Sequence, residues 1–233
     1  MLIKIFFLSL ISINLFALES PYLNFKNILD KVKLQAPTSK YNKKYSIKKG
    51  EFKNKYNKFF YLKNNLMTFN ICGFHNRSEL REINEWSTNT KKTKSLSGEV
   101  YLDITNPIKE FTFLQIHSNL NPNNKNGKEI NKPLLRIAYI SKRKNIHNHI
   151  WAIIRKSVKQ NKYKYIDLGE YKNNFLYFKI SVNNNNLNLN LNKKIYKEDI
   201  SYWEDQSNYF KAGVYLQDNS CSKVKFKKLK LIE

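Results

Sequence analysis

Metal-binding spacings are missing from this sequence. Its 233 residues include two cysteines, Cys72 and Cys221, and four histidines, and they contain no CxxC, HxxxH or HExxH pattern. Two isolated cysteines and scattered histidines are too few for a zinc centre, which needs several ligands at short spacings. We therefore expect neither a metal nor a cofactor. The triplet His147-Asn148-His149 is too short to indicate a nuclease and fits two alternating histidines on a surface strand.

Long apolar runs are also missing, apart from one at the start of the chain. The run from Ile5 to Phe16 is shorter than the roughly 20 residues that a membrane span needs. Lys4 precedes the run and the small residue Ala17 follows it, which is the pattern of a secretory signal peptide. We expect residues 1–17 to be removed and residues 18–233 to form a secreted or periplasmic bacterial protein without a membrane partner. In an oxidising compartment the two cysteines are able to form a disulfide.

Acidic side chains are scarce relative to basic ones. The chain has 18 Asp and Glu against 42 Lys and Arg, a formal net charge of +24. Such a balance favours an anionic partner, which leaves nucleic acid, an anionic membrane surface and an acidic polysaccharide. The abundance of Lys, Asn and Ile is also typical of an AT-rich genome, so the charge alone selects none of the three.

Helical periodicity is limited to the stretch from Pro21 to Leu34, which Pro37 stops. Beyond it, alternation of apolar and polar residues dominates, as in the segment from Pro133 to Ser141. The segment from Phe175 to Leu191 reads as a hairpin around an Asn-rich turn. The Lys- and Tyr-rich stretch from Lys40 to Lys63 fits early strands at least as well as a nucleic-acid-binding arm. Many short strands with polar turns predict one all-β domain, an antiparallel β-sandwich or jelly roll with few short helices.

Three of the predicted strands have an unusual polar face. Successive side chains of a strand point to opposite sides, so residues two apart share a face. The three faces carry planar, fork-shaped or titratable side chains: Arg77, Glu79 and Arg81; Gln115 and His117; Tyr209, Lys211, Tyr215 and Gln217. Two arginines within five residues of a lysine-dominated chain indicate a need for bidentate contacts to carboxylates. If these strands are neighbours, their faces merge into a groove that binds carboxylates.

These segments resemble a known family. RSELR (Arg77–Arg81), QIH (Gln115–His117) and YFKAGVYLQ (Tyr209–Gln217) are similar to the three signature segments of the polysaccharide lyase family 7 alginate lyases, and they occur in the family's order. The resemblance extends more weakly from about Phe59 to the C-terminus. Leu216 departs from it, because the family usually has asparagine there. By alternation Leu216 points away from the groove, so we expect little effect on the chemistry.

The resemblance implies a jelly-roll β-sandwich of two antiparallel sheets whose concave sheet binds alginate and cleaves it by β-elimination. It implies that Arg77 and Gln115 neutralise the uronate carboxylate, and that His117 and Tyr215 transfer protons. It also implies a monomer without a cofactor. Arg81, Glu79, Lys211, Gln217 and Tyr209 remain as substrate-binding residues, Lys211 contacting other subsites along the polymer and Glu79 orienting the two arginines.

Two other functions stay open from the sequence. A carbohydrate-binding jelly roll without activity needs the groove but neither His117 nor Tyr215, and the presence of both favours an enzyme. A lyase for another polyuronate, such as glucuronan, needs the same groove chemistry. A nucleic-acid-binding protein, in contrast, shows broad, salt-sensitive binding and no activity on uronates.

Overall fold

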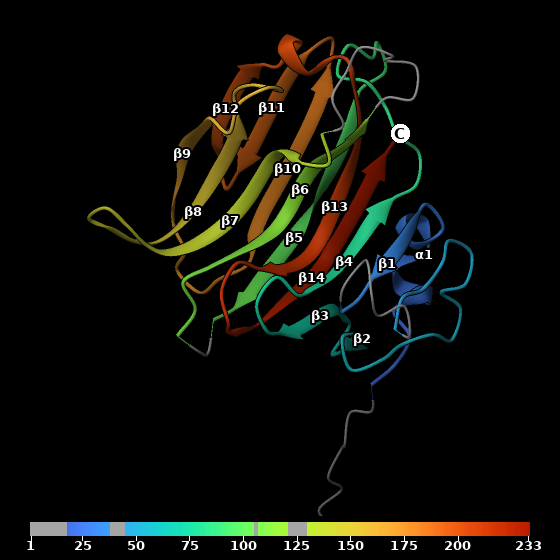
Figure 1. The fold of residues 1–233 in the computed structure, drawn as a ribbon. Helices are drawn as coiled ribbons and strands as arrows, with labels where there is room; N and C mark the ends of the chain where they lie inside the picture. Colours follow the sequence, from blue (N-terminus) through green and yellow to red (C-terminus); the bar gives the residue numbers. More distant parts are fainter. Residues whose placement is uncertain (1–17, 38–44, 105–106, 121–129) are drawn as a thin grey trace, which may run out of the picture.

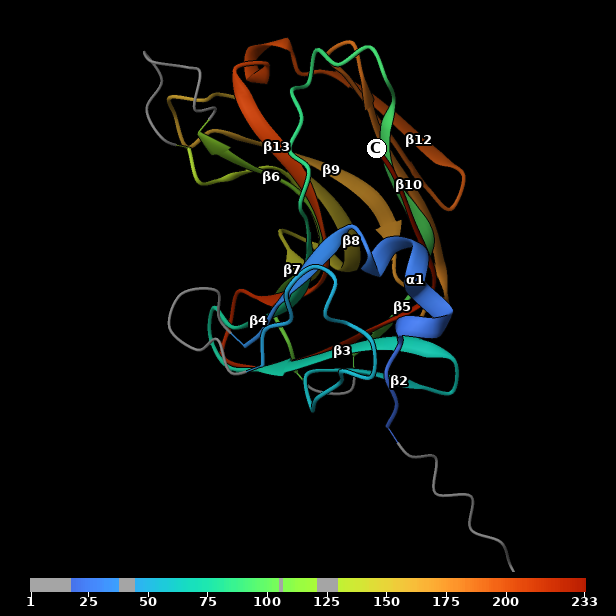
Figure 2. The same cartoon turned by 90° about the vertical axis from the view of Figure 1, so that its right-hand side faces the viewer.

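Two antiparallel sheets packed face to face form the protein (Figure 1). The computed structural model describes residues 18–37, 45–104, 107–120 and 130–233. The expected signal peptide, residues 1–17, and the first part of the stretch from Lys40 to Lys63 lie outside the described residues. Figure 2 shows the sandwich from the side, with the single helix of the described residues, α1 (Tyr22–Leu29), packed beside β14. The expected all-β sandwich is confirmed.

Each sheet has seven strands. The first sheet runs in the order β1 (Val32–Gln35), β4 (Arg77–Glu82), β13 (Gln206–Leu216), β6 (Glu110–Leu120), β7 (Pro133–Arg143), β8 (Ile146–Arg155) and β9 (Tyr163–Glu170). The second sheet runs in the order β12 (Lys194–Asp199), β11 (Asn186–Leu191), β10 (Leu176–Asn183), β5 (Lys94–Asp103), β14 (Cys221–Ile232), β3 (Leu66–Cys72) and β2 (Phe60–Lys63). A short 3₁₀ turn, η1 (Ser201–Trp203), leads into β13.

Alternation places one face of each sheet in the core. The hairpin of β10 and β11 is an example, because Leu187, Leu189 and Leu191 are buried as predicted. Its two turn residues, Asn184 and Asn185, both have positive φ angles, 45° and 59°. Asparagine tolerates this conformation better than most residues, and the turn matches the twist of the strands. The Asn-rich tract is therefore a turn.

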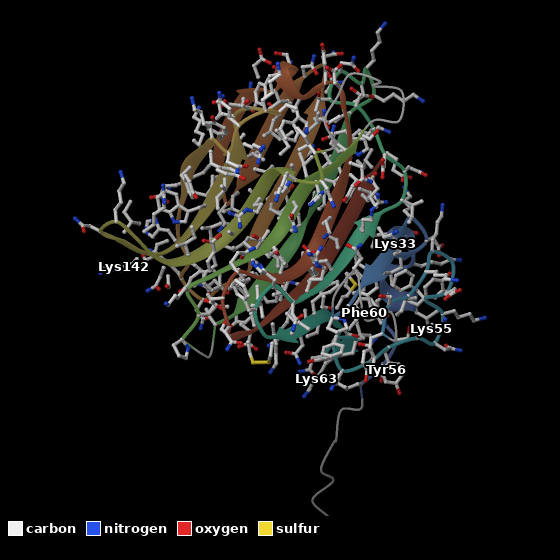
Figure 3. All side chains as sticks on the ribbon, in the orientation of Figure 1. Lys33, Lys55, Tyr56, Phe60, Lys63 and Lys142 are labelled. Atoms are coloured by element: carbon white, nitrogen blue, oxygen red, sulfur yellow. A yellow bond between two sulfur atoms is a disulfide. The ribbon has the colours of Figure 1, made fainter. Side chains whose placement is uncertain are left out.

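The N-terminal prediction is half wrong. The helix ends at Leu29, and Val32 begins a strand that pairs with β4. The apolar positions Val32 and Leu34 alternate with the polar positions Lys33 and Gln35, which suits the edge of a sheet as well as a helical turn. The open edge of β4 decides between the two by offering backbone hydrogen-bond partners. As a result, Lys33 lies on the edge strand β1 of the first sheet, far across the picture from Lys142 of β7 (Figure 3).

The stretch from Lys40 to Lys63 contains fewer strands than predicted. Within its described part, only Phe60–Lys63 forms a strand, and Ile47 makes an isolated bridge with Leu34. Phe52 is nevertheless fully buried, so aromatic side chains anchor this loop to the core. Burial without strand pairing explains why the residues look strand-like in the sequence.

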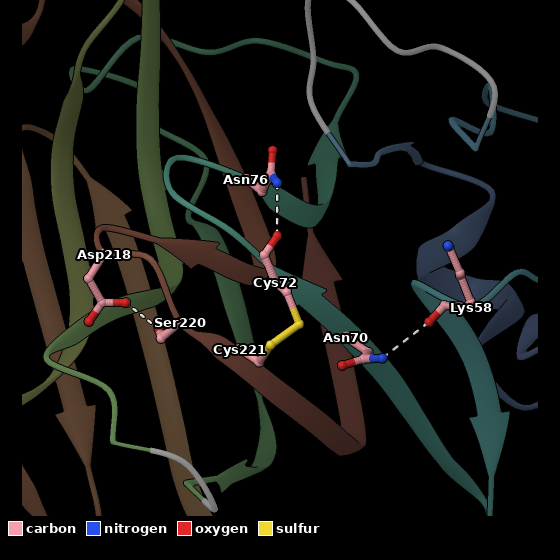
Figure 4. The surroundings of a disulfide bond; sticks show 7 residues. All are labelled: Lys58, Asn70, Cys72, Asn76, Asp218, Ser220 and Cys221. Atoms are coloured by element: carbon pink, nitrogen blue, oxygen red, sulfur yellow. Dashed lines mark hydrogen bonds between the residues drawn. A yellow bond between two sulfur atoms is a disulfide. The ribbon is translucent and has the colours of Figure 1, made fainter.

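A disulfide bond joins the two cysteines (Figure 4). Cys72 ends β3 and Cys221 begins β14, and the two residues are direct partners in the antiparallel pair. The sequence allows this bond on the condition that strands 77–81 and 209–217 run antiparallel, and β4 and β13 do so. The bond fixes the strand ends that flank the turn into β4.

Removing the disulfide is expected to destabilise the fold. The bond closes a loop with a sequence separation of 149 residues, and losing such a bond typically costs about 2–5 kcal/mol. The variant C72S/C221S should therefore unfold at lower urea concentration than the wild type. Reductant should shift the wild-type curve by the same amount and leave the variant unchanged. Equal midpoints for wild type and variant under oxidising conditions would contradict the prediction.

Candidate active site

The polar faces predicted from the sequence lie on neighbouring strands of the first sheet. β13 is paired with β4 on one side and β6 on the other, and β7 follows β6. The register aligns one row of side chains across these four strands: Arg81, Lys211, Gln115 and Arg136. Tyr209 lies opposite His117, and Tyr215 lies opposite Arg77. Side chains opposite each other in a sheet are close enough to interact, so three distant segments form one surface.

This surface encloses a cavity of about 460 Å³. Seven of the nine predicted site residues line it, whereas Glu79 and Gln217 do not. Its lining includes six cationic side chains: Lys33, Arg77, Arg81, Lys132, Arg136 and Lys211. No Asp or Glu occurs among the described residues that line it. A cavity with this balance favours a ligand that carries several negative charges.

Lys211 and Glu79 form a buried ion pair beneath the cavity. Lys211 is 2% exposed and Glu79 is 1% exposed, and their charged groups are 2.5 Å apart. Burial lowers the pKa of Lys211, while the Glu79 carboxylate acts in the opposite direction. Gln115 donates one N–H of its Nε2 to the other oxygen of Glu79. The pair therefore holds together β4, β13 and β6 at the centre of the site.

The burial of this pair corrects two expectations. Glu79 is buried and does not line the cavity, so the structure gives no support for its predicted contact with substrate. It lies 3.9 Å from Arg77, but Arg81 pairs with Glu85 instead, so Glu79 orients only one of the two arginines. Lys211 lines the cavity, but its side chain is buried. Its ammonium group donates to Glu79 and does not extend toward a distant part of a polymer.

The two arginines each pack against a tyrosine. The guanidinium of Arg77 lies 4.7 Å from the centre of the Tyr215 ring, and that of Arg81 lies 3.8 Å from the centre of the Tyr209 ring. The Nε atom of Arg77 is buried and has no hydrogen-bond partner among the described residues. Buried donors usually have a partner, so this atom is an exception in the site.

His117 is a neutral imidazole in this site. Burial, followed by the charge of Lys211, lowers its pKa to about 3. Its Nδ1 lies 3.1 Å from the carbonyl oxygen of Ser118 and 3.0 Å from the hydroxyl of Tyr209. A carbonyl oxygen only accepts, so a hydrogen bond to Ser118 requires the proton on Nδ1. In that tautomer the Tyr209 hydroxyl oxygen accepts from the same Nδ1–H, and the lone pair is on Nε2. Tyr209 is buried and stacks on His117. Its main contact in the site is therefore the histidine ring.

Tyr215 is a protonated phenol. Burial raises its pKa above the ordinary value, and Arg77 only partly offsets this effect. The sequence allows Tyr215 to act as a base if nearby cations lower its pKa, and the structure has the opposite shift. Its hydroxyl lies 2.9 Å from Nδ1 of His75, which precedes β4.

Backbone irregularities place Tyr215 over the site. The pairing of β13 with β6 shifts register between Ala212 and Tyr215, which is a β-bulge. Gly213, inside the bulge, has a φ of 145°, and a Cβ atom there would lie 2.2 Å from the carbonyl oxygen of Ser78. Only glycine permits this close approach of β13 to β4. The backbone geometry therefore explains why position 213 of YFKAGVYLQ is a glycine.

Several cavity residues were not predicted from the sequence. Lys33 and Gln35 were not identified, because the sequence pattern of their segment predicts a helix whereas the segment forms β1. Arg136 lines the cavity from β7 and donates to Glu110. Its position between the alternating apolar residues of PLLRIAY (Pro133–Tyr139) was the sequence pattern that could have identified it. Gln217, which was predicted, instead donates to the hydroxyl of Thr112 outside the cavity. Clusters of three or more His, Cys, Asp or Glu that could hold a metal do not occur in the described ranges.

Known proteins match both the sequence and the fold. A family model described as alginate lyase matches residues 27–233. An alginate lyase of Photobacterium sp. (strain ATCC 43367) is 28% identical over 236 residues, covering 84% of this chain and 80% of that protein.

Solved structures agree with these matches. The structure of alginate lyase AlyC3 is 28% identical and has a TM-score of 0.81, covering 93% of this chain and 96% of that one. Alginate lyase PA1167 from Pseudomonas aeruginosa has a TM-score of 0.73, covering 88% of this chain and 99% of that one. At 18% identity, PA1167 supports the fold alone.

Breaking the buried ion pair is expected to destabilise the protein strongly. In E79Q or K211M the remaining partner stays buried without its counter-charge, and each variant should lose about 3–5 kcal/mol of unfolding free energy. The double variant E79Q/K211M should lose less than the sum of the two. Chemical denaturation measures all three.

The exposed pair of Lys55 and Glu51, 2.9 Å apart, provides the matched control. E51Q should leave the unfolding free energy close to that of the wild type, because an exposed ion pair contributes little to stability. Equal effects of E51Q and E79Q would show that the buried pair has no special weight.

Proposed function

The chain belongs to the alginate lyase family, and we propose that it cleaves alginate by β-elimination with His117 as base and Tyr215 as acid. The observation that carries this proposal is the juxtaposition of a cationic cavity with a neutral imidazole and a neutral phenol. β-Elimination needs these three parts, because it must stabilise a carboxylate, remove a proton and protonate a leaving group.

Neutralising the carboxylate comes first. The C5 proton of a uronate is only weakly acidic while the adjacent carboxylate keeps its full charge. Arg77 and Gln115 both line the cavity, and the guanidinium of Arg77 and the second N–H of Gln115 Nε2 are suited to donate to that carboxylate. Both donors are fixed by Glu79, so they are positioned before substrate arrives. Losing one preorganised donor of this kind typically costs about 10²–10³ in rate.

His117 then removes the C5 proton. With its proton on Nδ1 and its pKa lowered, the imidazole presents a free Nε2 lone pair at neutral pH. Tyr209 hydrogen-bonds the same Nδ1 and stacks on the ring, with 5.4 Å between ring centres, so it holds the imidazole plane.

Tyr215 protonates the leaving glycosidic oxygen. Its raised pKa keeps the phenol protonated, which suits an acid rather than a base. A separate base and acid approach from opposite sides of the sugar, which fits guluronate, where the C5 proton and the C4 oxygen lie anti. Arg81 lies beside Tyr209 at the same cavity and is proposed to contact a neighbouring uronate carboxylate.

Alginate is the substrate that the relatives favour. One AlyC3 structure, 27% identical to this chain, was solved in complex with dimannuronate. The cationic cavity is equally suited to other polyuronates, so the assay must include them. We also propose export of the protein, because a disulfide bond such as Cys72–Cys221 persists in oxidising compartments.

Activity on polyuronates tests the proposed function. Alginate, glucuronan and pectate are incubated with the protein, and the ultraviolet absorbance of the 4,5-unsaturated product is followed. Alginate should give the fastest increase. Y215F should lower turnover by at least about 10²-fold because it removes the proton donor, and it should still bind the polymer. No chromophore from any polymer would remove the lyase proposal, and full turnover by Y215F would remove the role of Tyr215.

The pH profile tests the state of His117. Because its pKa is lowered to about 3, the imidazole is already deprotonated throughout neutral and mildly acidic solution. The value of kcat/KM, which reports on the free enzyme, should therefore not fall with a midpoint near the ordinary value of about 6.5, and its acid limb should lie below about pH 5. If kcat/KM instead falls with a midpoint near pH 6.5 in both the wild type and H75N, a variant without the His75 imidazole, the buried, neutral state of His117 is contradicted.

A further inference from the structure

We propose that His75 carries protons between solvent and Tyr215. The inference rests on the proposed role of Tyr215 as the acid, and it starts from the 2.9 Å contact between the Tyr215 hydroxyl and Nδ1 of His75. The two rings are nearly parallel, with an interplanar angle of 18° and 5.9 Å between their centres. His75 therefore touches the oxygen that gives up a proton in each turnover.

The position of His75 suits this role. It is exposed and is not among the residues that line the cavity, whereas Tyr215 is half-buried and lines it. Tyr215 thus lies between substrate on one side and His75 on the other. A bound polymer covers the cavity, so the phenol needs a path to water that does not pass through the substrate.

The turn that carries His75 is held in place from three directions. Gly73 donates its N–H to the carbonyl of Ser220. Asn76 donates its side-chain N–H to the carbonyl of Cys72, as Figure 4 shows. Leu216, the neighbour of Tyr215, donates its N–H to the carbonyl of Asn76. The disulfide at Cys72 and this link to β13 fix the turn relative to Tyr215, so the contact does not depend on a free loop.

The proton balance of the cycle requires such a path. Tyr215 gives its phenolic proton to the leaving oxygen and becomes a tyrosinate, while His117 keeps the C5 proton and later releases it to water. A water-derived proton binds Nε2 of His75 and gives an imidazolium. The imidazolium passes its Nδ1 proton to the tyrosinate, which restores a neutral phenol and leaves a neutral imidazole with its proton on Nε2. Because His75 is exposed, tautomer exchange through water returns the imidazole proton to Nδ1 before the next turnover. One proton enters through His75 and one leaves through His117.

The substitution H75G tests the proposal with little disturbance of the backbone. His75 has a φ of 55°, a conformation that glycine adopts freely, so H75G removes the imidazole and leaves the turn intact. Its kcat on alginate should fall by at least about tenfold, which is less than the roughly 10²-fold typical of a direct acid or base, because His75 acts through Tyr215. KM should be unchanged. Added imidazole should restore most of the lost kcat. A side chain that only supports the turn would not respond to imidazole.

Three further variants sharpen the test. H75N keeps an N–H donor, but its amide cannot take up a proton and pass it on. Its kcat should therefore be as low as that of H75G. In the Y215F background, H75G should cause no further loss, because both residues act in one step. H147A changes an exposed histidine on β8 and should keep wild-type kcat with or without imidazole. Thermal unfolding of each variant verifies folding, and H75N decides the matter if H75G does not fold.

The outcomes separate this inference from the proposed function. If the wild type forms no unsaturated product, the proposed function fails. If the wild type is active and Y215F is not, but H75G retains wild-type kcat, only the role of His75 fails. Full activity of H75N beside a slow H75G that imidazole does not rescue would assign His75 a hydrogen-bonding role and overturn proton transfer.

Discussion

The buried pair of Lys211 and Glu79 is the interaction on which the site depends. A charged group in a protein interior costs several kcal/mol of desolvation, and a pair repays that cost only with close geometry and further hydrogen bonds. Here Gln115 and Arg77 supply those additional contacts, so the same carboxylate that compensates Lys211 also fixes the two proposed carboxylate donors. The network connects three strands that are far apart in sequence, and its geometry is incompatible with a different register of β13.

The pair also sets the electrostatics around it. Lys211 disfavours a second positive charge nearby, and together with burial this keeps His117 neutral. Glu79 neutralises part of the cationic charge without entering the cavity, so the lining itself carries no carboxylate among the described residues. The cavity therefore attracts anions while its base stays unprotonated. These two requirements conflict in a simple cluster of cations, and the buried carboxylate reconciles them.

Alternation predicted the sandwich, the hairpin of Leu187, Leu189 and Leu191, and the shared faces of β4, β6 and β13. It did not predict which polar side chains are buried, because alternation assigns Lys211 and Tyr215 to the same face without describing the curvature of the sheet. Lys33 was missed because a short amphipathic segment fits a helix or an edge strand, and only the open edge of β4 selects the strand. Irregular positions such as the bulge at Gly213 carry no periodic signal in the sequence.

His75 illustrates the same limit for function. A histidine in a turn has no pattern that distinguishes it from a loop residue, and its place beside Tyr215 depends on three long-range features: the disulfide at Cys72, the Gly73–Ser220 hydrogen bond and the link from Asn76 to Leu216. None of them is local in sequence. Most residues of the family motif line the cavity, whereas His75, the residue proposed to supply protons to Tyr215, belongs to a neighbouring turn.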